Sequence, residues 1–245
     1  MEAAINNSRP DWPAAGRRQP APDDPDYLGS RGLSRGLQRA IDLELKGKKG
    51  LRILDVGCGQ KAFYPFFEPF CKTYIGTDIL RGDSLIDIVC PAESLAVKDE
   101  WADLVLCLSV LEHVNNPGNV VGELYRVVKQ GGLVFASTHG CFPWHPYPQD
   151  HWRWTQTGLP LLFKQHAAFS SVHLFSTRGS MSGIFFLLAH YSYRWTSEKG
   201  KLFLRRPLTT LINRLGEFLD RKSPGLADIN RPVTAIPEFF VIAKK

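Results

Sequence analysis

The sequence has no long apolar run and no cysteine pair in a metal-binding or redox spacing. Its longest continuous apolar stretch, Ile184 to Ala189, is far shorter than the roughly 20 residues needed to cross a bilayer. The five cysteines are odd in number, and none belongs to a C-x-x-C motif. These absences argue against a transmembrane helix, a disulfide framework and a zinc site. We therefore expect reduced thiols, a cytoplasmic location and no bound metal.

The N-terminal stretch also lacks an apolar core. Met1 to Asp26 is rich in Pro, Ala, Asp and Arg, so we expect a disordered arm over residues 1–26, and neither a signal peptide nor an anchor. The whole chain is 44% hydrophobic and 22% charged, which is enough to bury one core. Residues 27–245 are therefore predicted to form a single domain.

The basic residues do not form one stripe, although the formal net charge is +6. They gather in three separate stretches: Arg9 to Arg39, Lys46 to Lys49, and Arg194 to Arg231. A nucleic-acid surface would combine one basic face with interleaved aromatic residues, so we expect no nucleic-acid partner.

From Leu51 onward, short apolar runs alternate with helical patterns, which is typical of a parallel sheet built from β-α-β units. The expected strands are Leu51 to Val56, Thr73 to Thr77, Leu85 to Val89, Asp103 to Leu108, Leu133 to Thr138, Ser171 to Ser176 and Glu238 to Ala243. Helices are expected from Asn116-Pro117 to Gly131-Gly132, near Thr155 to Ala168, and in two apolar-periodic stretches, Gly183 to Trp195 and Leu202 to Leu219. The last two predict an inserted helical cap over residues 183–222.

The first strand runs directly into Gly57-Cys58-Gly59, where a tight turn lets a ligand approach the backbone. This loop also satisfies the loose dinucleotide fingerprint, so a nicotinamide- or flavin-dependent oxidoreductase is an alternative. Asp55 favours a different ligand, because a carboxylate beside the turn suits the ammonium and sulfonium of S-adenosylmethionine better than a pyrophosphate. Asp78 ends the second strand, where an acid can accept hydrogen bonds from a ribose diol of either cofactor.

Several motifs follow one another in an order that resembles the type 11 group of class I S-adenosylmethionine-dependent methyltransferases. They are Leu54 to Gly59, Gly76-Thr77-Asp78, Leu111-Glu112-His113-Val114, Glu123 to Gly132, and Phe239 to Lys244. The resemblance implies a Rossmann-like, doubly wound seven-stranded sheet with strand order 3-2-1-4-5-7-6, an antiparallel last strand and a helical insertion before it. It also implies the cofactor-binding residues, which are Asp55, Gly57, Cys58, Gly59, Asp78, Ile79, Ala92, Glu93 and Ser109.

The sequence departs from the group's pattern at Gln60, where a third glycine is common, and at Pro91, where an Asp is common. Pro91 removes a carboxylate and a backbone donor, so adenine recognition passes to Glu93 or to the Ala92 amide. These departures leave open a non-catalytic methyltransferase-fold module that binds a partner.

The loop from His139 to Trp154 is dense in proline, aromatic and titratable residues, and it follows the fifth strand directly. Its second half resembles a segment of type 11 enzymes found among surface-polysaccharide and glycoconjugate genes, which implies methylation of a hydroxyl on a small-molecule, sugar or glycolipid acceptor. His113, His145 and Asp150 are the candidate general bases. The alternative is a structural lid. The basic helical insertion offers peripheral membrane contact, against a simpler reading as a cap with a solvated face.

Overall fold

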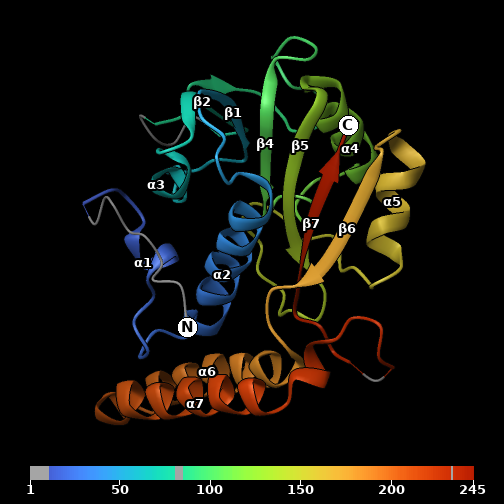
Figure 1. Ribbon diagram of the computed structural model, residues 1–245. Helices are drawn as coiled ribbons and strands as arrows, with labels where there is room; N and C mark the ends of the chain where they lie inside the picture. Colours follow the sequence, from blue (N-terminus) through green and yellow to red (C-terminus); the bar gives the residue numbers. More distant parts are fainter. Residues whose placement is uncertain (1–10, 81–84, 233) are drawn as a thin grey trace.

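The structure, a computed structural model, describes residues 11–80, 85–232 and 234–245. At its centre is one sheet with helices on both faces (Figure 1). The strands are β1 (Leu51–Val56), β2 (Cys71–Asp78), β3 (Ile88–Val89), β4 (Ala102–Leu108), β5 (Val128–His139), β6 (Ser171–Ser176) and β7 (Glu238–Lys244). The helices are α1 (Ala15–Arg18), α2 (Tyr27–Glu44), α3 (Tyr64–Phe67), α4 (Pro117–Val127), α5 (Gly158–His166), α6 (Ser180–Glu198), α7 (Leu202–Lys222) and a 3-10 turn, Pro224–Ala227.

The seven-stranded sheet has the order β3-β2-β1-β4-β5-β7-β6, as predicted. The pairs among β1 to β5 are parallel, whereas β7 runs antiparallel to both β5 and β6. This arrangement confirms the predicted fold and differs from the fully parallel six-stranded sheet that a dehydrogenase reading would require.

Alternate residues of the central strands pack on opposite faces of the sheet, because successive side chains of a strand point to opposite sides. In β4, Leu104 and Leu106 belong to the core on the α2 and α3 face. Val105 and Cys107 belong to the core on the α4 and α5 face. The sheet is therefore buried on both sides, as its continuous apolar runs indicate.

Two helical segments differ from expectation. Helix α2 was not predicted, because Gly29, Gly32 and Gly36 lower its helix propensity; all three lie against Thr177, Arg178 or their neighbours, where a larger side chain would crowd the contact. Helix α4 begins as predicted, with the Asn116 side chain accepting a hydrogen bond from the Asn119 N–H at 3.1 Å. It ends at Val127, and Gly131 (φ 73°) lies inside β5 and does not cap the helix.

The segment from Asp11 to Asp26 is ordered against the domain, in contrast to the disorder expected for residues 1–26. The Arg18 side chain is fully buried and donates to the Ala62 carbonyl, and Trp12 Nε1 donates to the Lys61 carbonyl at 3.0 Å. Polar groups of the arm thus find acceptors in the loop after β1, which its composition could not show. Residues 1–10 lie outside the described residues. The bounds of the domain, residues 27–245, and of the inserted cap, residues 183–222, stay predictions.

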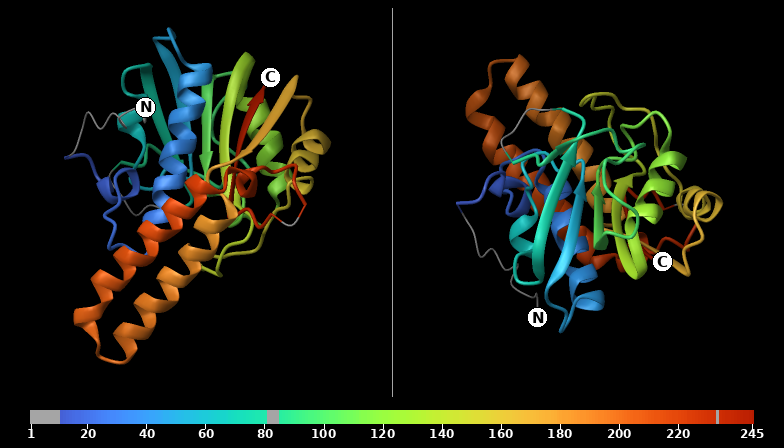
Figure 2. Two further views of the ribbon diagram at one scale, coloured as in Figure 1. Left: turned by 60° about the horizontal axis from the view of Figure 1, so that its bottom comes forward. Right: turned by 90° about the horizontal axis from the view of Figure 1, so that it is seen from above.

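Helices α6 and α7 form a hairpin that extends away from the sheet (Figure 2). Their positions match the helical insertion expected before the last strand. Within the described parts of the chain, none of the helices is long and apolar enough to span a membrane.

Candidate functional site

A cavity of about 710 Å³ lies at the carboxyl ends of β1, β2 and β4, where open α/β sheets bind ligands. Six of the predicted cofactor residues lie on its wall: Gly57, Asp78, Ile79, Ala92, Glu93 and Ser109. They come from four separate loops, which the parallel strands bring to one edge of the sheet. Asp55, Cys58 and Gly59 are not on this wall.

The glycine loop is shaped by its contacts with β2 and with the loop after β4. Gly57 has φ 68°, and a Cβ at this position would lie 2.4 Å from Val110 Cγ2, so only glycine fits without a shift. The Gly59 N–H donates to Asp78 Oδ2 at 2.9 Å. This hydrogen bond fixes the loop relative to Asp78, whose carboxylate lies on the cavity wall.

Asp55 lies beneath the loop and away from the cavity. Its side chain is buried, and Oδ2 accepts a hydrogen bond from the Tyr74 hydroxyl at 2.7 Å. Burial raises the pKa of this carboxyl to about 7, and the hydrogen bond from Tyr74 only partly offsets that rise. The carboxyl that the sequence argument placed beside a cationic ligand is thus bonded to Tyr74 and does not line the cavity, and its part in cofactor binding stays a prediction.

The loops after β2 and β3 give the cavity both apolar and polar groups, and the sequence predicted only some of them. Ile79 and Leu80 are 55% and 61% exposed and form an apolar surface beside Asp78. Glu93 Oε1 accepts from the Asn115 N–H at 3.1 Å, which ties the loop after β3 to the loop after β4. Leu80 and Asn115 were not predicted, because their roles depend on contacts between loops that are distant in sequence.

A second cavity, of about 410 Å³, adjoins the first. Ser109, His113 and Tyr147 line both cavities, so the two spaces meet at these side chains. Ser109 has φ 56°, a left-handed conformation that is uncommon outside glycine and often marks functional loops. The second cavity also contains His139 and His145, so it joins the loop after β5 to the cavity at β1 and β2.

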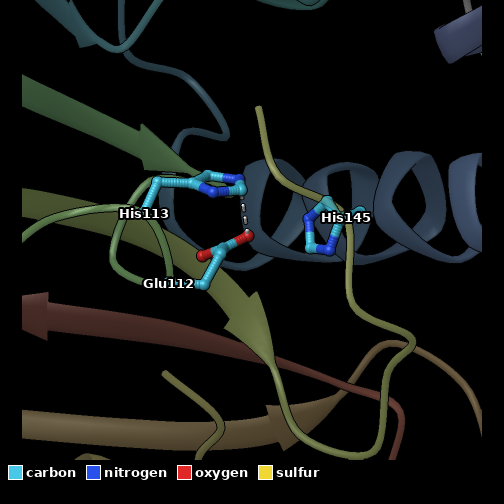
Figure 3. Close-up of side chains that lie close together, drawn as sticks. All are labelled: Glu112, His113 and His145. Atoms are coloured by element: carbon cyan, nitrogen blue, oxygen red, sulfur yellow. Dashed lines mark ion pairs between the residues drawn. The ribbon is translucent and has the colours of Figure 1, made fainter. Parts of the chain in front are cut away.

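Three histidines surround the Glu112 carboxyl where the cavities meet. Figure 3 shows His113 from the loop after β4 and His145 from the loop after β5, both near this carboxyl. Glu112 Oε1 lies 3.0 Å from His139 Nε2 and 3.9 Å from His113 Nε2, and Oε2 accepts from Thr138 Oγ1 at 2.8 Å. Burial raises the pKa of Glu112 to about 8 and lowers the pKa of both His139 and His113. Near neutral pH, burial thus favours uncharged forms of this group.

The hydrogen bonds of the two candidate histidines, His113 and His145, leave the same ring nitrogen available as a base. His113 Nδ1 is bonded to the Gln149 carbonyl, so this nitrogen carries the proton and Nε2 has the free lone pair. His145 Nδ1 lies 3.1 Å from the Pro143 carbonyl and 3.2 Å from Asp150 Oδ2, which leaves its Nε2 free in the same way.

Asp150 has a structural role in the loop after β5. Both of its carboxylate oxygens accept from the Arg153 guanidinium at 2.6 Å, and Oδ2 also accepts from the His145 N–H at 2.9 Å. The hydrogen bonds from Arg153 hold the pKa of Asp150 well below its usual range. This carboxylate is therefore suited to orienting His145 and poorly suited to taking a proton.

Comparison with known proteins identifies the family of this chain. A model of the methyltransferase domain matches residues 29–178, which is more than half of the chain. The chain belongs to the methyltransferase-domain family. Among curated proteins, this methyltransferase chain is 36% identical over 110 residues to a ubiquinone biosynthesis O-methyltransferase from Pseudomonas entomophila. That match covers 39% of this chain and 46% of the relative, so the chain spans less than half the length of the curated relative.

Solved structures agree on the fold of the methyltransferase. A SAM-dependent methyltransferase from Archaeoglobus fulgidus superposes with a TM-score of 0.53 at 17% identity and covers 88% of this chain and 94% of that one. Phosphoethanolamine N-methyltransferase 2 from Haemonchus contortus, in complex with S-adenosyl-L-methionine, has a TM-score of 0.54 at 14% identity, with 94% and 58% covered. At such identities the comparison supports the fold alone.

The junction of the two cavities also contains a group of possible metal ligands that the sequence did not predict. One ligand atom from each of Glu112, His113 and His145 lies within 4.8 Å of the others. The sequence signal was limited to the adjacent Glu112-His113 pair, because His145 arrives on a different loop. The same arrangement of side chains fits a bound cation and a histidine cluster held together by hydrogen bonds.

Proposed function

We propose that this chain transfers a methyl group from S-adenosylmethionine to a hydroxyl of a small molecule. The observation that carries the proposal is the pair of cavities that meet at Ser109, His113 and Tyr147. The first cavity lies at the glycine loop after β1, which is the predicted cofactor loop. The second lies under the loop from His139 to Trp154, which we call the acceptor loop. Membership of the methyltransferase-domain family and the likeness to an O-methyltransferase support it. A cytoplasmic location, expected from the unpaired cysteines, belongs to the same proposal.

The residues of the larger cavity fit S-adenosylmethionine. Asp78 offers carboxylate oxygens to the ribose hydroxyls, and Ile79, Ala92 and Glu93 surround the place for adenine. Gly57 lies on the wall of this cavity, so a ligand in it would pass close to the backbone of the turn. When bound, the cofactor supplies a methyl group activated by a positively charged sulfur.

His113 is the best-placed base because it lines both cavities. Its Nε2 would take the proton of the acceptor hydroxyl, and the oxygen could then accept the methyl group that bound S-adenosylmethionine would supply. His145, oriented by Asp150, faces the acceptor cavity from the opposite loop and is the second candidate. The protein otherwise aligns the two reactants and excludes water.

Exposed aromatic residues support a sugar or glycolipid acceptor as the finer proposal. Trp144 and Tyr147 are 74% and 83% exposed on the loop that covers the second cavity. Flat aromatic rings at the entrance to a pocket suit the apolar faces of sugars.

The α6–α7 hairpin supports peripheral membrane contact. Its surface combines large exposed apolar side chains, including Tyr191, Trp195 and Phe203, with exposed Arg194 and Arg206. This combination suits the boundary between anionic headgroups and acyl chains. A methyltransferase held there could reach a lipid-linked acceptor.

Two measurements test the proposed function. Calorimetric titration should show binding of S-adenosylhomocysteine and none of NADH; the reverse result would favour a nicotinamide oxidoreductase. With S-adenosylmethionine and a small-molecule extract of the source cells, release of S-adenosylhomocysteine should fall roughly 10²-fold in His113→Ala, with cofactor affinity nearly unchanged. His173→Ala, an exposed histidine on β6, is the matched control. Cofactor binding without any release of S-adenosylhomocysteine would favour a non-catalytic binding module.

A further inference from the structure

We propose that Arg178 binds an anionic group of the methyl acceptor, a carboxylate or a phosphate, in the second cavity. Arg178 lies between β6 and α6, and its side chain lines this cavity together with His139, Phe142 and Phe186. The inference deepens the proposed function and rests on it, because the acceptor is the molecule that would fill this space.

The guanidinium of Arg178 is buried without a hydrogen-bond partner. The residue is 7% exposed, and within the described part of the chain Nε, Nη1 and Nη2 all lack an acceptor. An arginine carries five N–H donors that cannot be lost by deprotonation in proteins, so leaving all of them unmet is costly. Such a group has an evident physical use if a ligand supplies the acceptors, and a carboxylate or phosphate matches its planar fork.

The two acids that line the same cavity are engaged elsewhere. Asp26 Oδ1 lies 3.0 Å from His190 Nε2, and Glu238 Oε2 accepts from Thr177 Oγ1 at 2.9 Å. Among the described residues, neither carboxylate comes within 4.0 Å of a nitrogen of Arg178. Burial raises the pKa of Glu238 and the charge of Arg178 only partly offsets that rise, so the two groups attract each other through space without forming a hydrogen bond.

Aromatic rings define the direction from this cation to the place of methyl transfer. The Arg178 guanidinium lies 4.8 Å from the centre of the Phe186 ring and 6.0 Å from that of Phe142. Phe142 stacks on His139 at 3.8 Å, and His139 in turn lies beside Glu112 near the junction of the cavities. An acceptor therefore has a flat apolar wall along one side, with its acid at Arg178 and its hydroxyl near His113.

The test uses the full chain and two simple anions as probes. Inorganic phosphate and benzoate are titrated at constant ionic strength, set with chloride, both with and without S-adenosylhomocysteine. At least one of them should bind saturably, and Arg178→Met should weaken that binding roughly 10-fold or more. Lys72→Met, which removes an exposed cation of β2, is the control and should leave the affinity unchanged. Binding of only one probe supports the proposal and identifies the kind of anion.

Stability measurements keep the test informative. Arg178→Met should raise the midpoint of urea unfolding of the ligand-free protein, because an apolar side chain replaces a buried guanidinium that has no hydrogen-bond acceptor. Glu238→Gln should strengthen anion binding by removing a competing carboxylate. If Arg178→Met and Glu238→Gln both lowered the unfolding midpoint, Arg178 would form a stabilising ion pair with Glu238, and the proposal would be overturned. Binding of neither anion would also overturn it. Loss of S-adenosylhomocysteine binding in the unmodified protein would instead defeat the proposed function, while the titration without cofactor would still test Arg178.

Discussion

At the scale of single residues, the buried carboxyl of Asp55 makes the stability of the folded protein depend on pH. Its folded-state pKa of about 7 lies above the ordinary value of 3.8, so the folded protein holds this proton more tightly than the unfolded chain does. The stabilisation is fully present below pH 4 and is lost as pH rises through about 7. Glu112, whose pKa is raised to about 8, acts in the same direction over a slightly wider range.

We therefore predict that Asp55→Asn stabilises the protein relative to the original chain, and more so as pH rises from 5 to 8. The amide of Asn can still accept the Tyr74 hydroxyl, while the cost of ionising a buried acid disappears. The difference in unfolding free energy should reach on the order of 1 to 4 kcal/mol at pH 8, measured by urea denaturation across this range. Asp42→Asn, at an exposed position of α2, is the control and should show no such trend. A difference that is independent of pH would contradict this account.

At the scale of single elements, helix α4 owes its start to local chemistry and its end to the sheet. Asn116 caps the first turn and Pro117 occupies the first helical position, where a missing N–H has little consequence. The other end is different, because Val128 already pairs with Ala102 as part of β5. The chain therefore leaves the helix before its glycines.

Asn116→Ala should lower the unfolding free energy by about 1 kcal/mol, because the Asn119 N–H loses its acceptor. Thermal or urea unfolding measures the change. The control is Asn119→Ala, an exposed substitution within the same helix that should be neutral or slightly stabilising. Equal effects of the two changes would show that the cap contributes little.

For the molecule as a whole, the α6–α7 hairpin is the feature that a compact catalytic domain does not require. It extends beyond the sheet (Figure 2). Its Phe203 side chain is 78% exposed. Such an apolar surface beside basic side chains is unfavourable in water alone and is suited to an anionic lipid surface.

Sedimentation with vesicles tests this surface. The protein should bind phosphatidylglycerol vesicles, bind phosphatidylcholine vesicles weakly, and lose binding between about 0.05 and 0.5 M salt as charges are screened. Replacing both Tyr191 and Phe203 by Ser should weaken binding several-fold. Trp144→Ser removes a comparably exposed aromatic ring from the acceptor loop and is the control. Equal binding to both vesicle types, or no effect of the double substitution, would rule out this use of the hairpin.

The sequence by itself determined the positions of most strands and the edge of the sheet at which the predicted cofactor residues lie. Strand positions follow from continuous apolar runs, and the parallel connections place Gly57, Asp78 and Ser109 at the same edge. Such features depend on residues close together in the chain, so periodicity, turn residues and motif order are sufficient to predict them. The resemblance to class I methyltransferases added the antiparallel position of β7, which periodicity alone does not specify.

Only the tertiary structure decided which of these residues line a cavity. Asp55 turns to Tyr74, Asp150 is held by Arg153, and Arg178 lies buried without a hydrogen-bond partner beside the second cavity. The glycine-rich α2 forms because other segments pack against it. Each outcome depends on contacts between residues far apart in the chain, where burial and pairing set both direction and charge. Local sequence carries no information about such partners until the fold brings them together.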